Sequence, residues 1–206
     1  MFKIFKRIFD IISASLLFLL ISPFFVVLML FVRILIGSPI FFTQARTGLN
    51  GQIFYIFKFR TMTNDVDLNG DLLPDEMRQT PFGTFLRSSS LDELPELLSI
   101  IKGDMSVIGP RPLPPIYDDY YTNYEKNRFK VRGGLIPPDS IYHNPTITWD
   151  EQLKCEAEYA NDLCLKKDIE IFLSVINILS NRNNSDYGMY VRKPLNIERM
   201  NRQNEN

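Results

Sequence analysis

The strongest constraint on this 206-residue chain is an uncharged run at residues 11–32, IISASLLFLLISPFFVVLMLFV. A helix needs about 20 apolar residues to cross the hydrocarbon core of a bilayer. The apolar core of a cleaved signal peptide is shorter, about 7–15 residues, and small residues follow it. Here the run continues into VRILIGSPIFF. The run therefore predicts a membrane helix in preference to a removed leader.

The flanks and the middle of the run bear on its topology. Basic residues mark the cytoplasmic side of a membrane. Those before the run are Lys3, Lys6 and Arg7, and Arg33 follows it. Pro23 removes one helical hydrogen bond and predicts a kink, and the Ser22 hydroxyl can take up a freed backbone group. Two arms broken at Ser22-Pro23 could re-enter the cytoplasmic leaflet, and a kinked full span stays equally open from the residues alone.

Composition limits the chemistry available to the rest of the chain. There are 23 basic and 24 acidic residues, a formal net charge of -1, which gives no reason to expect a nucleic-acid partner. His143 is the only histidine, and Cys155 and Cys164 have no metal or redox spacing. Any catalysis must therefore depend on carboxylates, lysines and arginines.

Residues 40–60 predict a β-hairpin that turns at GLNG, residues 48–51. Period-two alternation places Lys58 and Arg60 on one face of the second strand, where two cations suit a phosphate group. A solvated edge strand is the alternative, and the pattern does not separate the two.

Helices are predicted at 117–130, 149–161 and 167–181, a long mobile loop at 61–80, and a polar, loosely ordered tail from Asn183. The last helix has an apolar stripe, which predicts core packing or, as a second interpretation, a place at the membrane interface. The fold class is α+β, mostly helical with one hairpin. The expected domains are a membrane helix at 1–36, a catalytic domain at 37–182 and a tail at 183–206.

The stretch SSSLDELPELL, residues 88–98, carries the adjacent carboxylates of Asp92 and Glu93. A capping box of Ser90 and Glu93 would explain them structurally, but Pro95 would then fall inside the helix. A helix that starts between Asp92 and Leu94 fits better and puts both carboxylates at its mouth, where the helix dipole keeps them ionised. Such a pair can hold Mg²⁺, and a desolvated aspartate can attack phosphorus.

Basic residues surround this pair in the sequence. Arg87 precedes the serines, and the stiff turn GPRP, residues 109–112, holds Arg111 between two prolines. We expect Arg87, Arg111, Lys58 and Arg60 to converge on a diphosphate beside the carboxylates.

Together, KRIFDIISASLLFLLISP, FFTQARTGLNGQIFYIFKFRTM, FGTFLRSSSLDELPELLSIIKGDMSVIGPRPL and RFKVRGG resemble the bacterial sugar transferase family. These are monotopic polyprenol-phosphate phosphoglycosyl transferases, and the small, minimal-domain type is the most similar. The resemblance implies transfer of a sugar-1-phosphate from a UDP-sugar to undecaprenyl phosphate, with UMP as product. It also implies a re-entrant helix, interfacial amphipathic helices, and a catalytic domain on the cytoplasmic face of the bacterial inner membrane.

The resemblance also assigns roles to residues. Asp92 is the implied nucleophile, and Glu93 binds Mg²⁺ with it or assists the acceptor. The expected substrate-binding residues are Lys58, Arg60, Arg87, Arg111 and Pro112. The expected partners are the donor, the lipid acceptor and membrane lipids, with a homodimer left open.

The chain departs from the family between Arg132 and Trp149, where GGLIPPDSIYHNPTIT replaces a stretch close to PGITG and QVNGRN. The length is kept, but Gly133 stands where proline is usual and Pro137 where glycine is. We expect segment 133–148 to contact the donor and to bear on sugar choice. A non-catalytic scaffold for glycan assembly is the rival hypothesis, although it predicts loss of the dyad, which is present. A bitopic enzyme of periplasmic lipid phosphates is a third.

Overall fold

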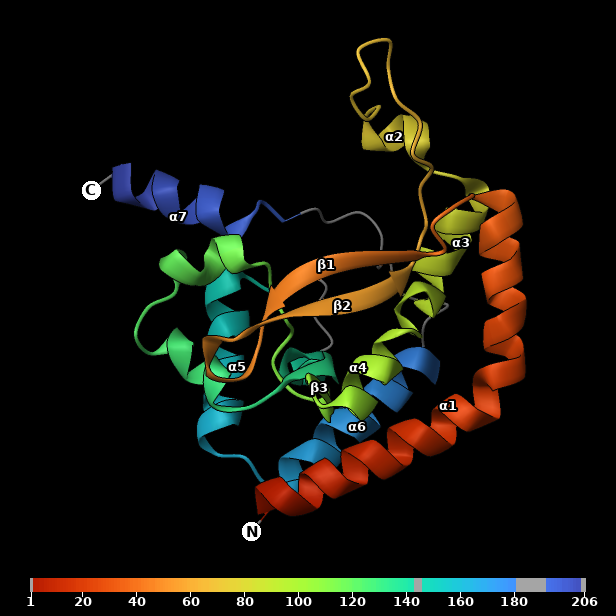
Figure 1. Ribbon diagram of the computed structural model, residues 1–206. Coiled ribbons are helices and arrows are strands. Elements are labelled where there is room, and N and C mark those ends of the chain that lie inside the picture. The colour runs from red at the N-terminus through yellow and green to blue at the C-terminus, as the bar shows by residue number, and fades with distance from the viewer. Residues whose placement is uncertain (1, 143–145, 181–191, 205–206) are drawn as a thin grey trace. The chain divides into compact units, whose positions relative to one another are not determined.

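The computed structural model describes residues 2–142, 146–180 and 192–204, and Figure 1 traces the order of their elements. Helices and short strands both occur, which confirms a mixed α and β chain. The chain forms two compact units. The first unit comprises Met1–Asp10, Ala45–Phe54 and Gly103–Asn206, and the second comprises Ile11–Gln44 and Tyr55–Lys102.

Helix α1 (Phe2–Leu35) is continuous and contains Pro23. Proline has no N–H to give to the carbonyl four residues back, which is that of Leu19. The Ser22 hydroxyl donates to this same carbonyl at 2.8 Å, as the sequence suggested. The ribbon of α1 turns a corner partway along in Figure 1. The expected break at Ser22-Pro23 is therefore a kink within an unbroken helix.

Side chains of α1 are largely uncovered by protein. Leu20 and Ile34 are 78% and 76% exposed. Only 17% of its most apolar 18-residue window is buried, and α1 alone among the described helices is long and apolar enough to cross a membrane. The core helix of a soluble protein would be mostly buried, so this surface is suited to contact with lipid.

The core of the second unit brings the C-terminal half of α1 against the hairpin and α3 (Pro81–Ser88). Phe25 of α1 lies 4.9 Å from the Phe59 ring of β2 (Ile53–Phe59), measured between centroids. Phe41 of β1 (Phe41–Thr47) stacks on the same Phe59 at 5.5 Å. Leu86 of α3 is fully buried in this cluster. Aromatic burial thus ties the second arm of α1 to the hairpin.

The predicted hairpin is confirmed. Strands β1 and β2 form a two-stranded sheet, joined by a 3-10 turn, η1 (Leu49–Gly51). Asn50 and Gly51 have φ angles of 56° and 74°, the left-handed conformation that such a turn requires.

The segment predicted as a long loop has local structure of its own. It contains the short helix α2 (Asp75–Arg78) and the bridges Met62↔Gln79 and Val66↔Leu72. The Asp67 carboxylate accepts from the backbone N–H groups of Asn69 and Asp71, at 2.8 and 3.0 Å. Helix α3 then starts at a Thr80 cap, whose side chain accepts from the Gly83 N–H, and α4 (Glu96–Lys102) ends before Gly103.

The first unit contains a parallel pair of strands that the sequence did not predict. β3 (Met105–Ile108) pairs with β4 (Gly133–Ile136), with Met105 opposite Gly133 and Ile108 opposite Ile136. Both strands are only four residues long. Nothing in a four-residue apolar run distinguishes a strand from a turn of buried helix.

Two helices of this unit match their predictions. α5 (Trp149–Asn161) begins at a capping box of Thr148 and Glu151, and α6 (Leu165–Ser180) follows it. The predicted helix at 117–130 is wrong. It is replaced by the 3-10 segments η3 (Pro115–Tyr120) and η4 (Glu125–Lys130). Thr122 and Glu125 exchange capping hydrogen bonds, which interrupt the predicted helix and begin the second 3-10 segment.

The remaining described elements are η5 (Pro138–Tyr142) and α7 (Leu195–Asn204). The expectation of a loosely ordered tail is wrong for α7, because Leu195 is fully buried beside Trp149 and Leu153. Residues 183–191 of that tail lie outside the described part of the chain.

The predicted apolar stripe of α6 comprises Ile169, Phe172, Val175, Ile176 and Leu179, and three of these residues lie outside the core. Ile169, Phe172 and Ile176 are 45–49% exposed, whereas Ile171, outside the stripe, is buried. The core-packing interpretation is therefore wrong for these three residues, and the interface interpretation stays a prediction.

A buried ionic network organises the first unit. The side chains of Arg128 and Glu156 pair at 2.7 Å and are 2% and 0% exposed. Arg128 also donates to the Tyr121 hydroxyl at 2.8 Å. Burial of the Asp139 carboxyl in η5 is the main cause that raises its pKa to about 6. The negative charge of nearby Glu156 adds to this rise.

We predict that Gly83→Ala destabilises the protein by about 1–3 kcal/mol, the usual cost of overpacking. A Cβ at position 83 would lie 1.8 Å from the Thr61 carbonyl oxygen, so backbone must move. Thermal unfolding of the purified protein in detergent measures the loss. Ser88→Ala, at an exposed position of the same helix, is the control. Equal unfolding midpoints for Gly83→Ala and the wild type would contradict the close approach.

Asp139→Asn should stabilise the protein at pH 8 by at most about 3 kcal/mol, with the gain shrinking as pH falls through 6. The folded carboxyl has a pKa of about 6 and an ordinary value of 3.8. The folded state therefore binds this proton more readily, and ionisation costs stability as pH rises. Unfolding midpoints from pH 5 to pH 8 check this, with exposed Asp119→Asn as the control. A difference that is constant with pH would refute it.

Candidate active site

Asp92 and Glu93 lie in a 3-10 turn, η2 (Leu91–Glu93), and not in the first turn of a helix. Helix α4 starts only at Glu96, directly after Pro95. The predicted start between Asp92 and Leu94 is therefore wrong by two to four residues, because proline ends the preceding turn and is followed by a new one. The dyad therefore does not lie in the first turn of a helix, and the helix dipole gives no reason to expect it to be ionised.

The capping-box alternative also fails. Ser90 adopts a left-handed conformation, with φ 58°, and its side chain makes no capping hydrogen bond. Non-glycine residues rarely adopt this conformation and are held in it by their surroundings, often next to functional groups. Ser90, in this conformation, lies in the turn between Arg87 of α3 and the dyad.

Lys58 connects β2 to the acidic turn. Its ammonium Nζ lies 2.6 Å from Glu93 Oε1 and 3.4 Å from Glu96 Oε1. The Glu96 side chain is only 7% exposed, and those of Lys58 and Glu93 are 21% and 25% exposed. One cation therefore balances two carboxylates in a partly desolvated position, where such a pair is stronger than at the surface.

Asp92 differs from its two acidic neighbours. Among the described residues, the only hydrogen-bond donor recorded at its carboxylate is its own backbone N–H, and no ion pair holds it. Burial raises its pKa above the ordinary value of 3.8. The positive charges of Lys58 and Arg87 act in the opposite direction, and Glu93 adds to the rise. Within the described part of the chain, Asp92 is thus a half-buried carboxylate without an ion-pair partner, and the charges of Lys58 and Arg87 in the same unit reach it.

The other predicted cations of this unit have separate partners. Arg87 donates through Nε to the Thr61 hydroxyl at 2.9 Å, yet its charge reaches Asp92. Arg60 lies just past the end of β2 and donates to the Ser38 carbonyl at 3.4 Å. Its buried Nε has no hydrogen-bond partner in the described part of the chain. Arg87 and Lys58 are therefore associated with the dyad. Within the described residues, Arg60 contacts the Ser38 carbonyl and not the dyad.

Arg111 and Pro112 belong to the first unit, so their convergence on the dyad stays a prediction. The Arg111 N–H donates to the buried Glu156 at 2.9 Å, which anchors the turn. The exposed Arg111 side chain contributes positive charge at Asp139 of the divergent segment.

The divergent segment packs directly on this turn. A Cβ on Gly134 would lie 2.1 Å from the Gly109 nitrogen, and one on Gly133 would lie 2.5 Å from Pro112 Cγ. A side chain at either position would require the turn at residues 109–112 to move, so glycine suits both positions. Residues 144 and 145 lie outside the described residues.

Asp92 and Glu93 are the candidate ligands for a metal ion. No group of three or more histidine, cysteine or acidic side chains is arranged to hold a metal ion within residues 2–142, 146–180 and 192–204. Mg²⁺ needs no such cage, because it commonly takes one or two carboxylates and completes its shell with water and substrate phosphates. The donor set of Asp92 and Glu93 therefore fits Mg²⁺ bound together with a phosphorylated substrate.

Sequence reasoning missed one residue of this site. Glu96 is buried against Lys58, and it was not singled out from the sequence. Its place three residues after Glu93 was a usable signal, because that spacing brings side chains together on one face.

Comparison with known proteins supports a common origin. The model of the family described as bacterial sugar transferase matches residues 1–182. A Bacillus subtilis protein, "Uncharacterized sugar transferase EpsL", is 40% identical over 85% of this chain and 88% of its own length. The "UDP-glucose:undecaprenyl-phosphate glucose-1-phosphate transferase" of Caulobacter vibrioides is 32% identical over 87% of this chain and 71% of its own.

A third relative covers less. The "Galactosyl transferase CpsE" of Streptococcus agalactiae is 35% identical over 69% of this chain, but the match spans only 35% of the relative. All three names describe a transferase; the Caulobacter vibrioides name gives glucose, the Streptococcus agalactiae name gives galactose, and the Bacillus subtilis name gives no particular sugar. The chain belongs to the bacterial sugar transferase family.

Proposed function

We propose that this membrane-associated transferase moves a sugar-1-phosphate from a UDP-sugar to undecaprenyl phosphate through a covalent intermediate on Asp92. One observation carries the assignment of the nucleophile. Lys58 holds Glu93 and Glu96, whereas Asp92 is partly desolvated and forms no ion pair with any residue that the structure describes. A carboxylate stripped of water and of a tight ion pair is the better nucleophile.

In the first half-reaction, an Asp92 carboxylate oxygen attacks the β-phosphorus of the donor. The new oxygen–phosphorus bond forms as the bond from that phosphorus to the bridging oxygen breaks. UMP leaves with the electron pair, and the sugar-1-phosphate stays on Asp92 as an acyl phosphate.

In the second half-reaction, a phosphate oxygen of undecaprenyl phosphate attacks the same phosphorus. The bond to Asp92 breaks, the carboxylate is restored, and a polyprenol diphosphate sugar is released. A covalent intermediate lets a water-soluble donor and a lipid acceptor use one site in turn. Glu93, held by Lys58, is positioned to assist the acceptor or to share a metal ion.

The charges at the dyad suit this chemistry. Both substrates carry phosphates, so attack by a carboxylate requires cations that neutralise developing charge. Lys58 and Arg87 supply this within the second unit, and we assign Arg60, Arg111 and Pro112 to donor binding. Mg²⁺, bound by Asp92 and Glu93, would add Lewis-acid stabilisation of the phosphates.

Segment 133–148 is our candidate for donor recognition. Its first residues pack on the turn that carries Arg111 and Pro112, and Asp139 lies within the field of Arg111. A segment in contact with a phosphate-binding turn is well placed to reach the attached sugar. Hydrogen-bonding groups there would discriminate between sugars, because an unmatched buried polar group is costly.

We further propose that α1 is re-entrant and that the catalytic residues face the cytoplasm of the bacterial inner membrane. The kink at Pro23 and the basic residues on both flanks support this. The exposed stripe of α6 would lie on the membrane interface.

Asp92→Asn should abolish turnover, with at least a thousandfold loss, because an amide is not a nucleophile toward phosphorus. Wild-type protein incubated with a UDP-sugar and Mg²⁺, without acceptor, should gain the mass of one phosphosugar on the peptide that contains Asp92. Exposed Asp71→Asn, in the same unit, should keep both activity and adduct. Turnover near the wild-type rate by Asp92→Asn would exclude a nucleophilic role.

Single cysteines introduced at Lys3 and Ser38, with Cys155 and Cys164 replaced by serine, should both resist an impermeant thiol reagent in intact cells. Both should react after the cells are opened, because a re-entrant helix leaves its two ends on the cytoplasmic side. Labelling of only the residue 38 variant in intact cells would demonstrate a full span.

A further inference from the structure

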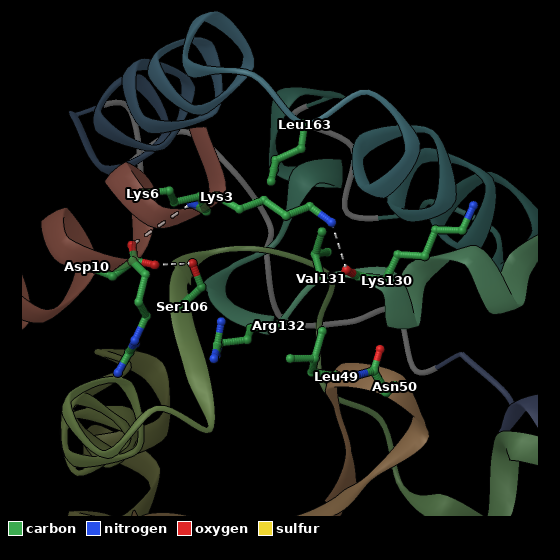
Figure 2. A pocket seen from close by; sticks show the side chains of 11 residues that line it. Lys3, Lys6, Asp10, Leu49, Asn50, Ser106, Lys130, Val131, Arg132 and Leu163 are labelled. Carbon is green, nitrogen blue, oxygen red and sulfur yellow. Dashed lines mark hydrogen bonds and ion pairs between the residues drawn. The ribbon is translucent and has the colours of Figure 1, made fainter. Parts of the chain in front are cut away.

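A basic cavity of about 300 Å³ lies in the first unit, formed by residues that the transfer reaction does not use. Its walls come from the first turns of α1, the η1 turn, β3 and the segment around Lys130 (Figure 2). The cationic residues that line it are Lys3, Lys6, Arg7, Lys130 and Arg132, and the only acidic residue in the lining is Asp10.

Two of these cations are balanced by carboxylates. Lys6 Nζ lies 2.8 Å from Asp168 and 4.0 Å from Asp10. Asp10 is buried and accepts from the Ser106 hydroxyl at 2.5 Å. The negative charges of Asp10 and Asp104 favour the charged form of Arg7. These groups form the structural base of the cavity.

Lys3 and Arg132 are not balanced in this way. Among the described residues, Lys3 donates only to the Lys130 carbonyl, at 3.5 Å. Arg132 donates through Nε to the Gly103 carbonyl at 2.7 Å. A neutral oxygen leaves the charge uncompensated, and the remaining guanidinium N–H groups are suited to bidentate contact with an oxyanion.

Like charges are also held close together here. Arg132 contacts the Gly103 carbonyl, and a Cβ on Gly103 would lie 3.2 Å from Arg7 Nη2. Two guanidinium groups beside one glycine repel each other, and an anion between them would relieve the repulsion. By contrast, Figure 2 shows the Lys130 side chain pointing away from the cavity, and its ammonium donates to Asn161 at 2.9 Å.

The uncharged part of the wall consists of the apolar Leu49, Val131 and Leu163 together with the polar Asn50 and Ser106. A cavity that combines surplus positive charge with a partly apolar wall matches an amphiphile better than a free ion. The uncharged run of α1 starts four residues after Arg7, about 6 Å along a helix. The cavity therefore adjoins the depth at which lipid headgroups lie.

We propose that this cavity binds a phosphate group, with an anionic membrane lipid headgroup favoured over a soluble phosphate as its source. Lys3 and Arg132 are the residues that recognise it. The site shares no residue with the acidic dyad, and the inference does not depend on the proposed transfer reaction. Occupation would fix the first turns of α1 at the membrane surface.

The test uses the full-length protein in detergent and counts bound lipid by native mass spectrometry. Phosphatidylglycerol should bind more tightly than phosphatidylcholine. Combining Lys3→Gln with Arg132→Gln should weaken phosphatidylglycerol binding roughly thirtyfold, as expected for two surface charges. Lys3→Gln alone, at an exposed side chain, should weaken it roughly fivefold and covers the case in which the double variant fails to fold.

The matched control removes the same charge elsewhere, with Lys126→Gln and Lys154→Gln, both exposed and outside the cavity. Glycerol 1-phosphate, titrated in a second arm, reports a soluble source. If it binds in a Lys3-dependent manner while the two lipids bind equally, the phosphate site stands and its ligand is soluble. If Lys3→Gln changes the binding of neither ligand, or if the control variant loses as much lipid binding as the double variant, the proposal is wrong.

Discussion

The contact between Phe25 and Phe59 is the constraint on which the second unit depends. It joins the C-terminal arm of α1 to β2 at a ring separation of 4.9 Å. Side chains alternate along a strand, so burying Phe59 turns its neighbour Lys58 to the opposite side. There Lys58 meets Glu93 and Glu96. The long apolar helix α1 and the acidic turn are consequently stabilised by one core, and a change in the packing of α1 would displace the cation at the dyad.

The electrostatics of the acidic turn separate carboxylates that look equivalent in the sequence. Asp92, Glu93 and Glu96 lie within five residues, and one lysine cannot balance all three. The ammonium contacts the two glutamates and leaves Asp92 partly desolvated, with a raised pKa. Such an arrangement stores unfavourable charge at Asp92 that a bound cation or a covalent bond to phosphorus would remove. The site is thus suited to a reaction whose intermediate neutralises this carboxylate.

Much of the local structure could be predicted from the sequence. The hairpin and α5 have strong local signals, a glycine turn and a capping box, and both form where expected. The kink at Pro23 and its repair by Ser22 also follow from local chemistry. The pairing of β3 with β4 could not be predicted, because it joins two short runs far apart in the chain. The helix at 117–130 failed because Thr122 and Glu125 cap each other in its middle.

By itself, the sequence determined the presence of a long apolar N-terminal helix, the identity of the family and the position of the acidic dyad, because each depends on residues adjacent in the chain. Only the tertiary structure decided which carboxylate is paired. That outcome depends on where β2 places Lys58, which no local pattern encodes. The same holds for Gly133 and Gly134, whose necessity appears only when the turn at Gly109 packs against them. Pairing and close approach are properties of distant segments brought together, and their energies arise only after the chain has folded.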